Sequence, residues 1–128
     1  VEVVNDSDMP IGRHVIADFW GARDLSDPDV LGQKMVEAAK KAGATVLGSH
    51  MHHFGDGAGV TGVVILAESH ISVHTWPEFQ YAAFDIFVCG NARPSIAIQV
   101  LKDELHPTHV DQKELSRGDR EMATAFQA

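Results

Sequence analysis

The chain of 128 residues contains a single cysteine, Cys89. One thiol cannot form a disulfide within the chain, and small secreted domains usually depend on disulfides. Long apolar stretches are also missing: the longest unbroken one runs from Val63 to Ala67, whereas a membrane helix needs about 20 residues. No signal-peptide pattern is present. These absences predict a cytoplasmic protein that does not span a membrane.

Positive charge is scarce as well. Ten Lys and Arg residues face 18 Asp and Glu residues, which gives a net charge of −8. Nucleic acids bind clustered basic residues, so a nucleic-acid partner is not expected. Hydrophobic residues make up 45% of the chain and charged residues 22%, as is typical of globular proteins. We expect one domain over residues 1–128, with residues 1–9 as a flexible lead-in.

Hydrophobic periodicity predicts six strands and two helices. One helix begins after the capping residues 26–28 and ends at Gly43, and the other runs from Pro94 to His106-Pro107. The expected strands are residues 13–20, 45–54, 60–67, 71–75, 81–88 and 109–115. Short connections between the strands favour an α+β fold, a two-layer sandwich whose antiparallel sheet has helices packed on one face.

The most unusual segment is residues 67–78, Ala-Glu-Ser-His-Ile-Ser-Val-His-Thr-Trp-Pro-Glu. Strand alternation places His70 and His74 on one polar face, with Ser69 at a bend. A serine nucleophile needs a nearby base, and a tightly bent peptide helps its hydroxyl reach the preceding carbonyl group. His74 is the natural acid or base, because an imidazole titrates near neutral pH.

This segment and its surroundings resemble the prokaryotic S-adenosylmethionine decarboxylase family, a pyruvoyl-dependent family of proenzymes. The resemblance extends from Gly12 to about Gly118, and Ser69, His74 and Cys89 have the family's spacing. The matching motifs are Gly59-Val60-Thr61-Gly62-Val63-Val64, Glu68-Ser69-His70, His74-Thr75-Trp76-Pro77-Glu78, Tyr81-Ala82-Ala83 and Asp85 through Gly90.

The resemblance implies that the chain cuts itself between Glu68 and Ser69. The Ser69 hydroxyl would attack the Glu68 carbonyl, and elimination would leave a β chain of residues 1–68 and an α chain of residues 69–128. Ser69 would become a covalent pyruvoyl group that forms a Schiff base with the amine of S-adenosylmethionine. Decarboxylation would then yield the aminopropyl donor for polyamine (spermidine) biosynthesis.

The resemblance also assigns roles to individual residues. His74 is the acid or base of processing, and Thr61 stands where many members have a serine that assists it. Cys89 corresponds to the proton donor for the decarboxylated carbon. Phe54 corresponds to an aromatic residue that stacks on adenine, and Glu78 to a carboxylate that binds the ribose. Members of the family work as dimers, so we expect a homodimer of processed protomers.

Other interpretations remain open at this stage. The same pyruvoyl chemistry can act on arginine or ornithine, or the chain can be a non-processing relative that serves as a binding or assembly module. Ser69 can be an ordinary turn residue, Cys89 a buried small hydrophobe and Phe54 a core residue. Zinc ligation by His14, His50, His52 and His53 is a further alternative. We expect no metal, because the spacing of these histidines is nonspecific.

Overall fold

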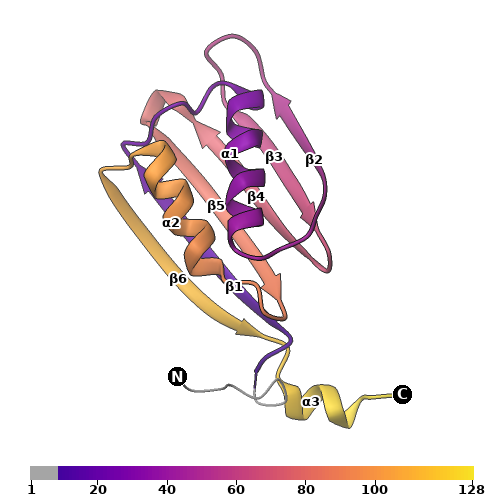
Figure 1. Cartoon of the computed structure of the whole chain (residues 1–128). Helices are drawn as coiled ribbons and strands as arrows, with labels where there is room; N and C mark the ends of the chain where they lie inside the picture. Colours follow the sequence, from indigo (N-terminus) through magenta and orange to yellow (C-terminus); the bar gives the residue numbers. More distant parts are fainter. Residues whose placement is uncertain (1–8) are drawn as a thin grey trace.

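Six strands form an antiparallel sheet, and two helices cover one of its faces (Figure 1). The computed structural model describes residues 9–128, so the expected lead-in at residues 1–9 lies, except for Met9, outside the described residues. In spatial order the strands are β2 (Val46–His53), β3 (Val60–Leu66), β4 (Ser69–Trp76), β5 (Tyr81–Cys89), β1 (Gly12–Trp20) and β6 (His109–Arg117).

Both covering helices begin at a proline. A proline in the first helical position loses no hydrogen bond, because the N–H it lacks has no partner within the helix. The carboxylate of Asp27 caps α1 (Pro28–Lys41) by accepting hydrogen bonds from two backbone N–H groups of its first turn. α2 (Pro94–Leu105) ends at His106, which has left-handed backbone angles. These helix boundaries confirm the expectations from the sequence.

Alternate residues of the central strands are buried beneath the two helices. In β4, Ile71 and Val73 are fully buried, whereas His74 and Trp76 on the opposite face are exposed. The largest fully buried side chains include Phe19, Leu31, Met35, Phe84, Ile86 and Leu101. We call the opposite face, which neither α1 nor α2 covers, the open face (Figure 1). The predicted α+β sandwich is therefore confirmed.

The structure differs from the predicted elements at a few boundaries. β4 begins at Ser69, two residues earlier than expected, because Ser69 pairs with Leu66 across a two-residue turn. Two short helical elements were not expected: η2 (Pro77–Phe79) and α3 (Arg120–Ala125). Elements of three and six residues are too short to show a periodic apolar pattern. No helix in the described part of the chain is long and apolar enough to cross a membrane.

Candidate active site

The turn that joins β3 to β4 holds its second residue in a strained conformation. Ala67 and Glu68 form this turn between the paired residues Leu66 and Ser69. The commonest hairpin turns of two residues place one or both of them at positive φ angles, which glycine, asparagine and aspartate adopt most easily. Glu68 has a φ of 59°, which costs a residue with a Cβ atom about 1–2 kcal/mol. The Glu68–Ser69 peptide bond therefore lies next to stored strain.

Three candidate side chains meet at this turn. The Ser69 Oγ lies 3.4 Å from the Cys89 Sγ, at hydrogen-bond distance for sulfur. The thiol also lies 3.7 Å from a carboxylate oxygen of Glu68. Cys89 is only half-buried, so the interpretation as a buried small hydrophobe does not describe it. We call Glu68, Ser69 and Cys89 the cleavage end of the sheet, after the cut that the sequence predicts between Glu68 and Ser69.

The remaining candidates lie at the opposite end of the same strands. His74 pairs with Thr61 across β3 and β4, and the Thr61 Oγ1 lies 3.1 Å from the His74 Nδ1. Glu78 follows in η2, immediately after β4. Phe54 follows β2 and is 61% exposed, so it is not a core residue. We call Phe54, Thr61, His74 and Glu78 the histidine end.

The two ends are too far apart to work together within one chain. Ser69 is the first residue of β4 and His74 lies five residues further along the strand. At about 3.3 Å per residue, this separation is about 17 Å, whereas proton transfer needs hydrogen-bond contact or one bridging water. A single protomer therefore brings Ser69 and Cys89 together, and Thr61 and His74 together, but does not join the two pairs.

A charged cluster on the open face was not predicted. The Asp85 Oδ1 lies 2.6 Å from the His14 Nε2 and 3.2 Å from the His70 Nε2. Arg117 donates a hydrogen bond of 3.1 Å to the His14 Nδ1. The sequence does show one sign of this cluster, because Asp85 is a charged residue within the otherwise apolar strand β5. Its partners were not predictable, because His14 and Arg117 reach it only through the pairing of β1 with β5 and β6.

Aromatic rings cover the open face near the histidine end. Tyr81 stacks between Trp20 and Trp76, with ring centroids 4.3 and 5.3 Å apart. The Tyr81 hydroxyl donates a hydrogen bond of 2.6 Å to Asp18. Burial, and then the hydrogen bond and the negative charge of Asp18, raise the pKa of Tyr81 to about 12. Tyr81 is therefore a neutral donor at physiological pH.

The histidines considered as zinc ligands are scattered. His14 lies on β1, and the other three lie on the edge strand β2, four strand spacings away, which is about 19 Å. Within residues 9–128, no three His, Cys, Asp or Glu side chains are grouped closely enough to hold a metal ion.

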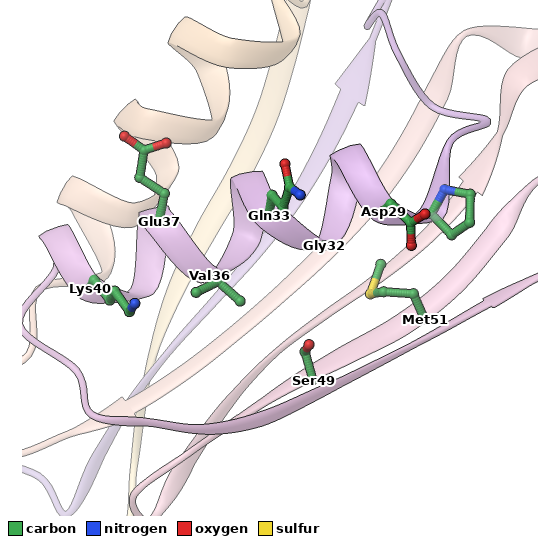
Figure 2. Close-up of a pocket in the computed structure, with 9 residues that line it drawn as sticks. Asp29, Gly32, Gln33, Val36, Glu37, Lys40, Ser49 and Met51 are labelled. Atoms are coloured by element: carbon green, nitrogen blue, oxygen red, sulfur yellow. The ribbon is translucent and has the colours of Figure 1, made fainter.

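A groove of about 630 Å³ lies between α1 and β2 (Figure 2). Gly32 and Val36 of α1 and Met51 of β2 line it, together with charged residues of α1. This groove lies on the side of the sheet that the helices cover. None of the predicted site residues lines it, so the groove is separate from the candidate site.

Known proteins resemble this chain in sequence and in fold. The sequence profile of the S-adenosylmethionine decarboxylase family matches residues 13–118. The "S-adenosylmethionine decarboxylase proenzyme" of Acidithiobacillus ferrooxidans is 41% identical over 115 residues, which cover 88% of this chain and 86% of that protein. The proenzyme of the same name from Methanococcus maripaludis is 40% identical over 111 residues, which cover 84% of this chain and 90% of that protein.

A solved structure gives the same result. The crystal structure of the adenosylmethionine decarboxylase from Aquifex aeolicus superposes with a TM-score of 0.76 at 34% sequence identity. The match covers 86% of this chain and 92% of that chain. The residues that the family profile matches, 13–118, include nearly all of the sheet and both covering helices.

Proposed function

The chain belongs to the S-adenosylmethionine decarboxylase family, and we propose that it cuts itself at Glu68–Ser69 and then decarboxylates S-adenosylmethionine. The products are decarboxylated S-adenosylmethionine, the aminopropyl donor of polyamine (spermidine) biosynthesis, and carbon dioxide. The observation that carries the proposal is the contact between Ser69 and Cys89 at a strained turn. The name "proenzyme" of the relatives supports a precursor that must be processed.

The geometry of the turn fits formation of a pyruvoyl group from Ser69. The serine Oγ attacks the carbonyl carbon of Glu68, the C–N bond breaks and the nitrogen becomes a free amine. A base then removes the Cα proton of residue 69, a Cα–Cβ double bond forms and the Cβ–Oγ bond breaks, so the oxygen leaves as part of the new α-carboxylate of Glu68. Water replaces the nitrogen, which leaves as ammonia. Release of the positive φ at Glu68 favours the cut product, because a chain end adopts relaxed angles.

The new group supplies a ketone that binds the substrate amine and accepts the electrons released when carbon dioxide leaves. The residues of the chain then control proton transfer. The Cys89 thiol, 3.4 Å from the Ser69 Oγ, delivers a proton to the substrate carbon that lost its carboxylate. The side-chain carboxylate of Glu68, which lies 3.7 Å from the same thiol, then belongs to the last residue of the β chain.

We further propose that the working unit is a homodimer whose open faces meet. The two ends of β4 lie about 17 Å apart within one chain. A two-fold axis parallel to the sheet and perpendicular to β4 places the cleavage end of one protomer opposite the histidine end of its partner. Large apolar side chains stand exposed on the open face and support burial there: Ile16, Trp20, Ile65, Trp76 and Leu115.

In such a dimer the partner supplies the groups that bind the nucleoside. An exposed Phe54 ring stacks on adenine, and the Glu78 carboxylate accepts hydrogen bonds from ribose hydroxyls. The aromatic stack of Trp20, Tyr81 and Trp76 offers π faces that attract a sulfonium cation. Arginine and ornithine have no adenosine group, so Phe54 and Glu78 favour S-adenosylmethionine over them. A cytoplasmic location stays a prediction, which is based on the single cysteine and the missing signal-peptide pattern.

Intact mass and carbon dioxide release test this proposal together. A processed protein gives two fragments of roughly 7 kDa each, from average residue masses, in place of the 13.9 kDa chain. We expect these fragments, and release of labelled carbon dioxide from carboxyl-labelled S-adenosylmethionine but not from arginine or ornithine. A chain that stays whole after long incubation and releases no carbon dioxide contradicts the proposal and favours a binding or assembly module.

A further inference from the structure

Asp85 is the centre of a cluster to which the proposed reaction assigns no step. One oxygen of its carboxylate lies 2.6 Å from His14 and 3.2 Å from His70. His70 pairs with Phe87, and Ser72 pairs with Asp85, so Asp85 and His70 are diagonal neighbours on the open face, within reach of each other's side chains. The carboxylate of Asp85 therefore links His14 of β1 to His70, the second residue of β4.

The hydrogen atoms of this cluster follow from the chemistry of Arg117. A guanidinium group only donates hydrogen bonds, so the His14 Nδ1, 3.1 Å from Arg117, is an acceptor and bears no hydrogen. The proton of the neutral His14 ring then lies on Nε2 and points to Asp85. His14 is thereby fixed in one tautomer. The same Asp85 oxygen accepts a second hydrogen bond, from the His70 Nε2.

The Phe87 ring contacts three members of this cluster: His14, His70 and Arg117. His70 stacks on it at 6.1 Å with an interplanar angle of 19°, and His14 is tilted at 5.3 Å. The Arg117 guanidinium lies 5.9 Å from the centre of the same ring, where a cation–π interaction is favourable. A side chain at Gly12 would collide with Phe87, so the absence of one makes room for the ring. Two contacts therefore hold the His70 ring in place: the hydrogen bond to Asp85 and the stacking on Phe87.

We propose that Asp85 is a positioning residue, which holds His70 and thereby the backbone nitrogen that bears the reactive group after cleavage. This inference rests on the proposed function. Before cleavage the turn at Glu68 ties the start of β4 to β3, and cleavage removes that tie. A free strand end tends to fray, whereas a displacement of about 1 Å near a reacting group can cost about 100-fold in rate. The hydrogen bond to Asp85 replaces the lost constraint.

The test compares two matched variants of the full chain. Asp85→Asn keeps the shape of the side chain but removes its charge. Asp111→Asn is the control, because Asp111 makes a similar hydrogen bond with His109, of 2.9 Å, far from the cleavage end on β6. In the processed protein we expect Asp85→Asn to lower kcat about tenfold or more and to change KM less than about twofold. Asp111→Asn should change neither.

Hydrogen exchange provides a second readout, independent of turnover. In peptides covering residues 69–76 of the processed protein, Asp85→Asn should raise amide exchange about tenfold, and Asp111→Asn should leave it unchanged. His70→Phe keeps a ring on Phe87 but cannot donate to Asp85, so it should reproduce both effects. The double variant with Asp85→Asn should be no worse than His70→Phe alone, because the two residues act as one unit.

The outcomes separate this inference from the proposed function. If Asp85→Asn and His70→Phe both behave like Asp111→Asn in kcat and exchange, the positioning role is wrong. If Asp85→Asn does not fold, His70→Phe decides the question alone. If the wild-type chain neither cuts itself nor releases carbon dioxide, the proposed function fails. In that case the uncut turn still ties β4 to β3, and the positioning role, which concerns the free strand end, is overturned together with the proposed function.

Discussion

The two ends of β4 differ in how the fold holds their reactive groups. At the cleavage end, a strained two-residue turn and the end of β5 press Ser69, Glu68 and Cys89 into contact. At the histidine end, His74 is exposed and contacts Thr61 through one hydrogen bond. The groups of the first end contact one another within one chain, whereas those of the second are mostly exposed. The difference is the one that the proposed dimer requires, in which each protomer supplies a different end of the site.

Removal of the Ser69 hydroxyl is the change with the largest expected effect. Ser69→Ala should abolish cleavage and lower carbon dioxide release by at least about 10⁴-fold, because no nucleophile remains to form the reactive group. Intact mass should stay at 13.9 kDa. Ser72→Ala, in the same strand, is the control and should cut like the wild type. Cleavage of Ser69→Ala between the same two residues would place the nucleophile elsewhere.

Cys89→Ala should separate the two reactions of the cleavage end. Loss of the proton donor should lower turnover about 100-fold or more, whereas Ser69 keeps its hydroxyl and its strained neighbour, so cleavage should go on. Turnover of purified, fully cut protein provides the measurement, with the extent of cleavage determined by mass. Unchanged turnover would show that Cys89 is not the donor.

Complementation tests whether the two ends join across a dimer. Ser69→Ala damages only the cleavage end and His74→Ala only the histidine end, so each alone should be inactive. Co-expressed, they should regain about a quarter of the wild-type sites, because half of randomly paired dimers are mixed and one of their two sites is intact. Activity equal to the sum of the two separate variants would place both ends of each site in one chain.

The strain at Glu68 can be removed without loss of a catalytic group of the proposed reaction. Glu68→Gly should stabilise the uncut Ser69→Ala chain by about 1 kcal/mol, since glycine adopts a positive φ freely. In the wild-type background it should slow cleavage several-fold. Gln80→Gly is a matched control, because Gln80 has a φ of 50° far from the cleavage site. Equal cleavage rates in both variants would show that strain does not drive the reaction.

The smallest expected effect concerns Tyr81 at the histidine end. This residue is the only tyrosine of the chain, so ultraviolet absorbance reports its ionisation alone. Its pKa is about 12 in the fold and about 10 when unfolded. The neutral phenol therefore contributes its full stability below pH 10, and the contribution is lost as the pH rises towards 12. Asp18→Asn should lower this pKa only in part, because burial is the larger cause. A wild-type midpoint near 10 would contradict the stacked, hydrogen-bonded geometry.

Much of the fold was predictable because its signals are local. The Asp27 cap, the left-handed end of α2 and the alternation of Ile71 and Val73 all act within a few residues of chain. α3 was not predicted, because its six residues are too few to show a helical period of apolar residues. The start of β4 at Ser69 was placed two residues late, since only its pairing with Leu66 makes polar residues part of the strand.

The sequence provided the candidate residues, which are Ser69 after Glu68, the thiol of Cys89 and the imidazole of His74, and the family resemblance implied their roles. Which of these residues touch depends on how the strands pair in the sheet. The register of β4 with β5 brings Cys89 to Ser69, while the length of β4 keeps His74 away. The pairing of β1 with β5 also brings His14 to Asp85, although the two strands are far apart in the chain. Such contacts depend on sheet order and packing, which are long-range properties that no local pattern encodes.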